Sequence, residues 1–164
     1  MIRQVEQYHG TALARLVRSE GSPAIKLQWH PRYRSAYALD GCVAVYMKYS
    51  TNRLSPWTFG FKSEHQAEIA DLRDEFDEAF VALVCGTDGV ACLSSAEYQR
   101  VLDDVLRASE WVRVARGPRQ KYAVTGSDGR QGFRVGDNEY PAKVYAAIRQ
   151  IERYGVVGWP RSDL

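Results

Sequence analysis

The sequence has no long apolar run and few cysteines, and each shortage excludes a class of protein. No apolar stretch approaches the roughly 20 residues that cross a bilayer, and residues 1–6 lack the apolar stretch of a signal peptide. The three cysteines, Cys42, Cys85 and Cys92, lie in apolar segments without a CxxC pair. That usage is typical of small buried side chains in a reducing compartment, not of a disulfide framework. We therefore expect a soluble cytoplasmic protein without a membrane partner.

The chain also has almost no excess of one charge sign over the other. With 22 Lys and Arg against 20 Asp and Glu, the formal net charge is +2, so a nucleic-acid footprint must come from local clusters of basic residues. The three histidines, His9, His30 and His65, stand apart in the sequence, which argues against a zinc site. The stretch 86–89 has two glycines but lacks the lysine and the helix start of a phosphate-binding P-loop.

What the sequence does contain is the pattern of one α/β domain. Its 164 residues, 45% of them hydrophobic, suffice for a sizeable core. The spacing of apolar residues predicts helices over 2–18, 63–76, 95–107 and 141–154. It predicts strands over 24–29, 35–39, 42–47, 57–61, 80–85, 90–93, 111–115, 121–124 and 132–135. We expect a single domain over 1–164: a mixed β-sheet flanked by helices over 1–108, with a C-terminal β-rich and helical extension over 109–164.

Turn and cap residues mark the ends of several of these elements. Asp40-Gly41 is a hairpin turn pair between two predicted strands. Ser63 with Gln66 three residues later has the pattern of a helix capping box. Ser94 is a second helix cap.

Four stretches follow one another in an order known from a nuclease family: 6–10 on the first helix, 40–50 over the hairpin, 63–69 on the second helix and 80–85 in an apolar strand. In this order residues 2–106 resemble the restriction-endonuclease-like, or PD-(D/E)XK, core, most closely its Holliday-junction-resolvase-like branch. The resemblance implies a restriction-endonuclease-like fold. It also implies Mg²⁺ held by two or more carboxylates, with a lysine two residues after one of them on the same strand.

The chain departs from that signature. Lys48 stands at the lysine position, but Tyr46 occupies the place of the carboxylate, and 31–33 contains no acid. Cleavage would therefore need a rearranged site of Lys48, Glu6, Asp40 and Gln66, with Glu6 and Asp40 as the Mg²⁺ ligands. The alternative is that the chain has lost the cleavage activity and kept the binding of nucleic acid.

Each of these residues also has a structural interpretation. Asp40 serves the turn, Gln66 caps a helix, and Lys48 can reach solvent from a strand end. Glu6 shares a helix face with Gly10, Leu13 and Val17, which predicts a carboxylate turned toward the sheet or a boundary position with access to water.

Two segments combine basic and aromatic residues. The first, 29–34, contains Trp29, Arg32 and Arg34, and Arg53 is expected nearby. The second segment, with Trp111 at its start and one acid, Asp128, contains Arg113, Arg116, Arg119, Lys121, Arg130 and Arg134. Arginine forks bind phosphate and aromatic rings stack on bases, although most charged runs are simply solvated.

These observations predict a nucleic-acid-binding protein on a nuclease-like scaffold, with DNA favoured over RNA. By family association it is a divergent Mg²⁺-dependent phosphodiesterase in defence or mobile-element biology. The alternative is a catalytically inactive interaction module or accessory subunit, indicated by ten Tyr and four Trp residues, Trp159 among them. Both a homodimer and a separate protein partner remain open.

Overall fold

The computed structural model describes residues 1–129 and 131–154, so Arg130 and Trp159 lie outside the described residues. The helices and strands, in chain order, are α1 (Gln4–Arg18), β1 (Leu27–Trp29), β2 (Ala36–Leu39), β3 (Val43–Ser50), β4 (Trp57–Lys62), α2 (Ser63–Glu75), β5 (Glu78–Cys85), β6 (Gly89–Leu93), α3 (Ser95–Val101), β7 (Ser109–Ala115), β8 (Tyr122–Gly126), β9 (Phe133–Val135) and α4 (Glu139–Tyr154).

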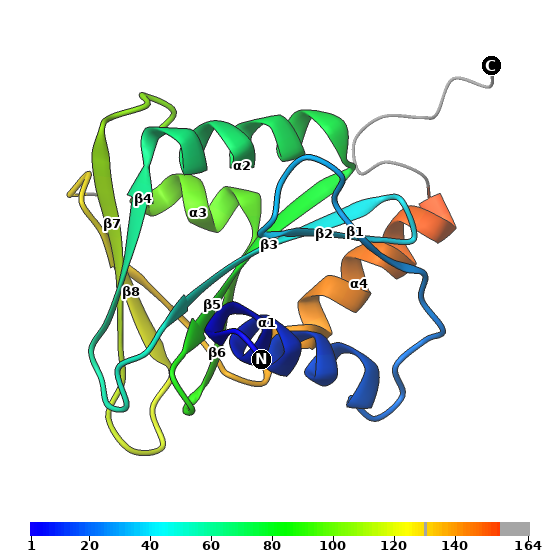
Figure 1. Ribbon diagram of the computed structural model, residues 1–164, viewed down its shortest axis with the longest axis horizontal. Helices are drawn as coiled ribbons and strands as arrows, with labels where there is room; N and C mark the ends of the chain where they lie inside the picture. The colour runs from blue at the N-terminus through cyan, green and yellow to red at the C-terminus, as the bar shows by residue number, and fades with distance from the viewer. Residues whose placement is uncertain (130, 155–164) are drawn as a thin grey trace.

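The strands form two sheets (Figure 1). The first sheet is mixed, in the order β1-β2-β3-β5-β6, and its central pair β3 and β5 is parallel while its other pairs are antiparallel. The second sheet is antiparallel, in the order β4-β7-β8-β9. The prediction of an α/β fold with a mixed sheet and flanking helices is confirmed.

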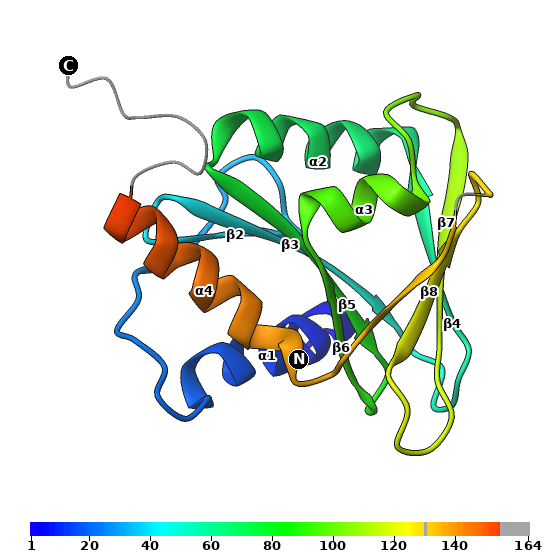
Figure 2. The ribbon, with the colours of Figure 1, turned by 180° about the vertical axis from the view of Figure 1, so that it is seen from behind.

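Helices cover both faces of the first sheet. α1 and α4 pack on one face, as Figure 2 shows from behind, and α2, α3 and the second sheet lie on the other. Val45 and Met47 of β3 enter the core beside α1 and α4, whereas Ala44 and Tyr46 enter the core beside α2. This explains the continuous apolar run of β3, because a central strand buried on both faces cannot alternate with polar residues.

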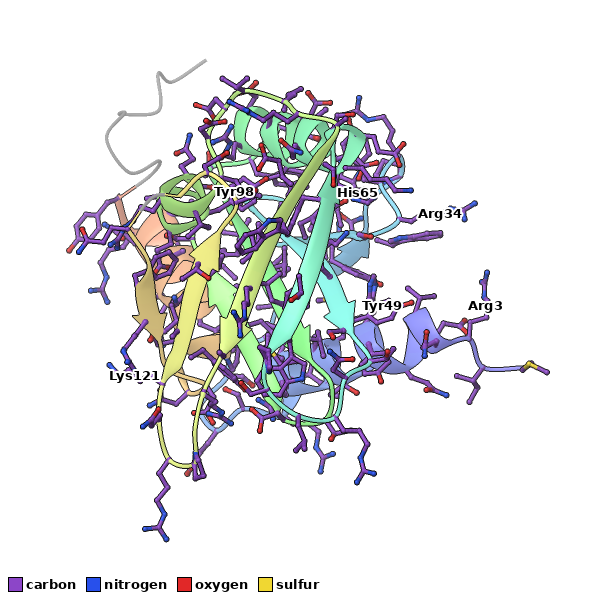
Figure 3. All side chains as sticks on the ribbon, turned by 90° about the vertical axis from the view of Figure 1, so that its left-hand side faces the viewer. Arg3, Arg34, Tyr49, His65, Tyr98 and Lys121 are labelled. Atoms are coloured by element: carbon purple, nitrogen blue, oxygen red, sulfur yellow. The ribbon has the colours of Figure 1, made fainter. Side chains whose placement is uncertain are left out.

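The second sheet has one buried and one exposed face. Along β4, Trp57, Phe59 and Phe61 are buried while Thr58 and Lys62 are exposed. β7 alternates in the same way. Such alternation is the pattern of an antiparallel sheet that covers a core on one side and meets water on the other. The outer face of the second sheet faces the viewer in Figure 3.

Three expectations about the elements were wrong. α3 ends at Val101 instead of 107, and Val105 is exposed. α2 is capped by Lys62, whose backbone N–H donates to His65 Nδ1 at 3.2 Å, and not by Ser63 with Gln66. β4 leaves the first sheet and pairs with β7, so the second sheet spans the expected boundary at 108.

Other local predictions are confirmed. Ser94 caps α3 by accepting a hydrogen bond from the N–H of Glu97. Cys42, expected to be buried, is half-buried, whereas Cys85 and Cys92 are buried free thiols. Burial raises the pKa of each of these thiols to about 12. In the part of the chain that the structure describes, no helix is long and apolar enough to cross a membrane.

Candidate functional site

Lys48 lies near the end of β3 and turns toward α2. Its Nζ is 3.2 Å from His65 Nδ1 and 5.0 Å from the centre of the Phe61 ring. Burial lowers the pKa of Lys48, and the carboxylate of Glu68 opposes that shift. Lys48 is therefore held between β3, β4 and α2 and does not extend into bulk solvent.

The hydrogen bonds of His65 fix its tautomer. Nδ1 receives the backbone N–H of Lys62 and also faces the Lys48 ammonium. Both groups are donors, so Nδ1 must be the unprotonated acceptor and Nε2 carries the proton. Burial and the charge of Lys48 lower the pKa of His65, which keeps this neutral form at neutral pH.

Glu68 supplies a carboxylate beside the position where the nuclease signature expects one. It comes from α2, and its Oε2 accepts a hydrogen bond from the Tyr46 hydroxyl at 2.7 Å. Burial, followed by this bond, raises the pKa of Tyr46. Glu68 and His65 were not predicted as neighbours of Lys48; their spacing of three on one helix was the available signal.

Glu6 does not join this group, and of the two orientations predicted for it the structure has the position with access to water. The buried residues of α1 are His9, Ala12 and Leu16, while Glu6 is exposed and accepts a hydrogen bond from the Arg3 N–H at 2.6 Å. α1 contacts the opposite face of the first sheet, where Tyr8 stacks on Tyr49 at 4.8 Å. Because neighbouring residues of a strand point to opposite faces, Lys48 and Glu6 lie on different sides of the sheet.

Asp40 and Gln66 have structural partners of their own. Asp40 sits in the predicted turn with a φ of 52°, and its Oδ1 accepts a hydrogen bond from the Lys26 N–H at 2.6 Å. The turn lies at the opposite end of β3 from Lys48. Gln66 is buried and donates from Nε2 to the carbonyl oxygens of Phe61, at 2.9 Å, and of Arg107, at 3.1 Å.

The implied Mg²⁺ does not fit these residues. Glu6 and Asp40, the two expected ligands, have separate surroundings: Glu6 lies in the first turn of α1 and lines a cavity with Trp29 and Arg34, whereas Asp40 lies in the β2–β3 turn and accepts from Lys26. Within residues 1–129 and 131–154, no three His, Cys, Asp or Glu side chains are grouped so that they could hold a metal ion. We derive no step through a metal at these positions.

Among the basic residues of the second segment, Arg116 has a structural role. Its guanidinium contacts Asp88 Oδ2 at 2.8 Å and Asp137 Oδ2 at 3.0 Å, and it lies over the ring of Tyr122 at 4.2 Å. The hydroxyl of Tyr122 donates to the same oxygen of Asp88 at 2.7 Å. The Arg116 guanidinium is thus engaged by two carboxylates and an aromatic ring, and it links the 86–89 turn to β7, β8 and the residues before α4.

The other predicted contact residues differ in how free they are. Arg32 is paired with Glu75 at 3.3 Å. In the described part of the chain, no ion pair engages Arg34, Arg53, Arg113, Arg119 or Lys121. Arg53 and Arg119 line one cavity of about 470 Å³ between the loop before β4 and the turn after β7.

Arg113 lies on the outer face of the second sheet, in the middle of a cross-strand row. Thr58 of β4 and Thr125 of β8 are its partners on either side. Outward-facing side chains of this sheet are Thr58, Lys62, Ser109, Trp111, Arg113, Thr125 and Arg134. Among the outward-facing residues of these four strands there is no carboxylate, so these strand positions are all basic or neutral.

Trp111 gives this face an aromatic surface with space beside it. Its side chain is 42% exposed, and its cross-strand partner is Gly60. A Cβ added at Gly60 would meet nothing within 4 Å. Directly opposed side chains in an antiparallel pair lie about 5 Å apart, so the missing side chain leaves the flank of the indole open. This pairing was not predicted, because it joins residues far apart in the sequence.

The outer face of the second sheet is the part of the molecule best suited to an extended anionic ligand. It combines an accessible indole, threonine hydroxyls and basic side chains, with no acid at the outward-facing strand positions that the structure describes. No family model, curated protein or solved structure matches the chain.

Proposed function

We propose that this protein binds single-stranded nucleic acid on the outer face of its second sheet. The observation that carries the proposal is Trp111 beside the open position at Gly60, on a face without a carboxylate. An unpaired base can stack on an exposed aromatic ring, and this contact is tolerant of sequence because every base has a π-face.

The neighbouring side chains suit a phosphate backbone. Arg113 stands one outward position from Trp111 on β7, a separation of about 6.8 Å at 3.4 Å per residue. This is close to the repeat of an extended nucleotide strand, so a base on Trp111 and a phosphate at Arg113 are compatible. Lys62 and Arg134 extend the positive charge to the two outer strands. Thr58 and Thr125 add hydroxyl donors on both sides of Arg113.

A flat sheet face fits a single strand better than a duplex. A duplex is read by elements that enter its grooves, whereas unstacked bases are splayed across a sheet and held by aromatic side chains. Single-stranded DNA is therefore the first ligand to test, with RNA and duplex DNA as parallel arms.

We also propose that the first sheet with α1 and α2 is a restriction-endonuclease-like scaffold. In its support, α1 is followed by the strands β1, β2 and β3, and β5 returns parallel to β3 after α2. This is the order that the resemblance predicts. The proposed function is binding and includes no hydrolytic step.

The test is a fluorescence-anisotropy titration of labelled oligonucleotides at several salt concentrations, with and without Mg²⁺. We expect binding to single strands that weakens with salt, and Arg113→Ala should reduce the log–log salt slope by about 0.7 for the lost phosphate contact. Trp111→Ala should weaken binding about tenfold, since stacking on one base contributes about 1–3 kcal/mol.

Three outcomes would contradict the proposal. The first is binding to duplex but not to single strands, and the second is binding that Trp111→Ala leaves unchanged. The third is an absence of binding to any nucleic acid at low salt, which would favour the interaction module as the better account.

A further inference from the structure

A cavity of about 410 Å³ lies between the start of α1 and the β1–β2 hairpin, on the other side of the first sheet from Lys48. It is lined by Arg3, Val5, Glu6, His9, Trp29, Arg34 and Tyr37. Figure 3 shows Arg3 and Arg34 reaching out from the same edge of the molecule. The volume is in the range of pockets for small ligands.

Trp29 presents a fixed aromatic surface at this cavity. Its side chain is 65% exposed, but its indole N–H donates to the Arg34 carbonyl at 3.1 Å. A large exposed ring that is tied to the backbone loses little freedom when a planar group stacks on it.

The loop that carries Trp29 and Arg34 is held from inside by His30. His30 is buried, and its Nδ1 accepts the backbone N–H groups of Arg32 and Tyr33, each at 3.2 Å. Its Nε2 is 3.1 Å from Glu75 Oε2. Since Nδ1 is the acceptor, Nε2 carries the proton and donates to Glu75. The loop is thus organised before any ligand arrives.

The charged groups of the cavity favour a ligand with little negative charge. Arg34 makes no ion pair with any described residue, and Arg3 has only a long contact of 3.9 Å with Glu6. Two guanidinium groups against one carboxylate leave a charge of about +1 at neutral pH. That balance suits a phosphate monoester better than a triphosphate.

The inner wall of the cavity contains a histidine with a free ring nitrogen. His9 is 4% exposed, and its Nδ1 is 3.0 Å from the Tyr37 hydroxyl. Its Nε2 makes no hydrogen bond to any residue that the structure describes. Nε2 is not among the buried side-chain atoms that lack a partner, so it stays accessible, and a ligand or water in the cavity can meet it. Burial lowers the pKa of His9, so this partner meets a neutral imidazole.

We propose that this cavity binds a nucleoside monophosphate unit, with the base on Trp29 and the phosphate between Arg3 and Arg34. The unit is either a free nucleotide or the phosphorylated end of a strand. This site is separate from the outer face of the second sheet, and it stands even if that face binds nothing.

The indole N–H resonances of a ¹⁵N-labelled sample test the proposal directly. Tryptophan-to-phenylalanine variants assign the signals of Trp29 and Trp111 in a two-dimensional spectrum. Titration with AMP should shift the Trp29 signal to saturation and leave the Trp111 signal in place. Adenosine and ribose 5-phosphate, which each lack one half of the ligand, should bind at least tenfold more weakly. An unshifted Trp29 signal at millimolar AMP would overturn the proposal.

Variants separate the two guanidinium groups from general charge effects. Arg34→Ala should weaken AMP binding about tenfold, while Arg32→Ala, which removes a neighbouring charge paired with Glu75 outside the cavity, should change it less than twofold. Glu6→Gln keeps an acceptor for the Arg3 N–H and removes the opposing charge, so it should tighten binding. Equal losses for Arg34→Ala and Arg32→Ala, or weaker binding by Glu6→Gln, would contradict the assignment.

Two further probes distinguish the source of the ligand and the two proposals. A 5′-phosphorylated oligonucleotide that shifts Trp29 at lower concentration than AMP identifies a strand end, while equal concentrations identify a free nucleotide. An unphosphorylated oligonucleotide should shift Trp111 alone. With the 5′-phosphorylated oligonucleotide, a response at Trp29 without one at Trp111 would refute the sheet-face proposal and support the cavity. A response at Trp111 without one at Trp29 would refute the cavity and support the sheet face.

Discussion

Arg113 and Arg116 provide the sharpest contrast in the molecule, because they are three residues apart and were both expected to contact nucleic acid. Arg113 is exposed on the outer face of the second sheet, while Arg116 is bound by Asp88 and Asp137. Replacing either with alanine removes one positive charge. Arg116→Ala should lower the stability of the fold and leave nucleic-acid binding unchanged. Arg113→Ala should weaken nucleic-acid binding and leave the stability unchanged.

The magnitude for Arg116 follows from its contacts. The side chain is 17% exposed, and its partners Asp88 and Asp137 are 32% and 50% exposed. Breaking a fully buried pair costs about 3–5 kcal/mol, and the partial exposure of both carboxylates reduces that figure, while the stacking on Tyr122 adds about 0.5–1 kcal/mol. We expect a loss of about 3 kcal/mol, which lowers Tm by about 6–12 °C in a domain of this size.

Thermal unfolding is followed by circular dichroism and binding by oligonucleotide titration, both on the wild type and on the three variants Arg113→Ala, Arg116→Ala and Arg116→Lys. Arg116→Lys is the control: it keeps the charge but loses the planar fork, so its Tm should fall between wild type and Arg116→Ala. Arg113→Ala should keep its Tm, since exposed substitutions stay within about 0.5 kcal/mol. An Arg116→Ala protein that unfolds at the wild-type temperature and loses binding would show that Arg116 contacts the ligand and does not hold the fold.

Two other predictions concern the histidines. His30→Ala leaves the N–H groups of Arg32 and Tyr33 without their acceptor. The free energy of unfolding in urea should fall by about 2–4 kcal/mol, given about 1–3 kcal/mol for each unpaired donor. His30→Asn offers a new acceptor and should recover about half of that loss, so equal losses for the two variants would contradict the role given to Nδ1. Burial lowers the pKa of His9 and of His65 below the ordinary 6.5. Their contribution to stability is therefore complete above about pH 6.5 and is lost as the pH falls through the folded values. The free energy of unfolding should decline from pH 7 to pH 5, and a His9→Gln, His65→Gln double variant should show a flatter decline; an unchanged slope would count against buried neutral rings.

Much of the fold could be predicted because the relevant signals are local. The Asp40-Gly41 pair has positive φ angles at both residues, 52° and 67°, which is why those residue types mark the turn. The apolar runs of β3 and β5 identify a buried parallel pair. The departure of β4 also had a signal, since 57–62 alternates apolar and polar residues as a half-exposed strand does.

The orientation of α1 could not be predicted from apolar spacing alone. Its buried face is marked by His9, Ala12 and Leu16, and a histidine does not count as apolar. The side of the sheet on which Lys48 lies depends on which alternate residues of β3 point to which face. A strand that is apolar on both faces does not reveal this in its sequence.

The candidate sites depend on contacts between distant segments. Gly60 meets Trp111, and Arg116 meets Asp88 and Asp137, only when the chain has folded. Sequence spacing has no information on these pairs, so it identified basic segments without separating structural arginines from free ones.

If a base occupies the open position beside Trp111, filling that position in Gly60→Val should weaken binding. Gly60 has an extended backbone and free space at its Cβ, and valine favours strands more than glycine does, so the variant should fold with unchanged or higher Tm. The added side chain would fill the flank of the indole. Anisotropy titration with single-stranded DNA should then show binding weakened about tenfold, by analogy with the loss of one stacked base. A Gly60→Val protein that is folded and binds single strands as tightly as wild type would contradict the account.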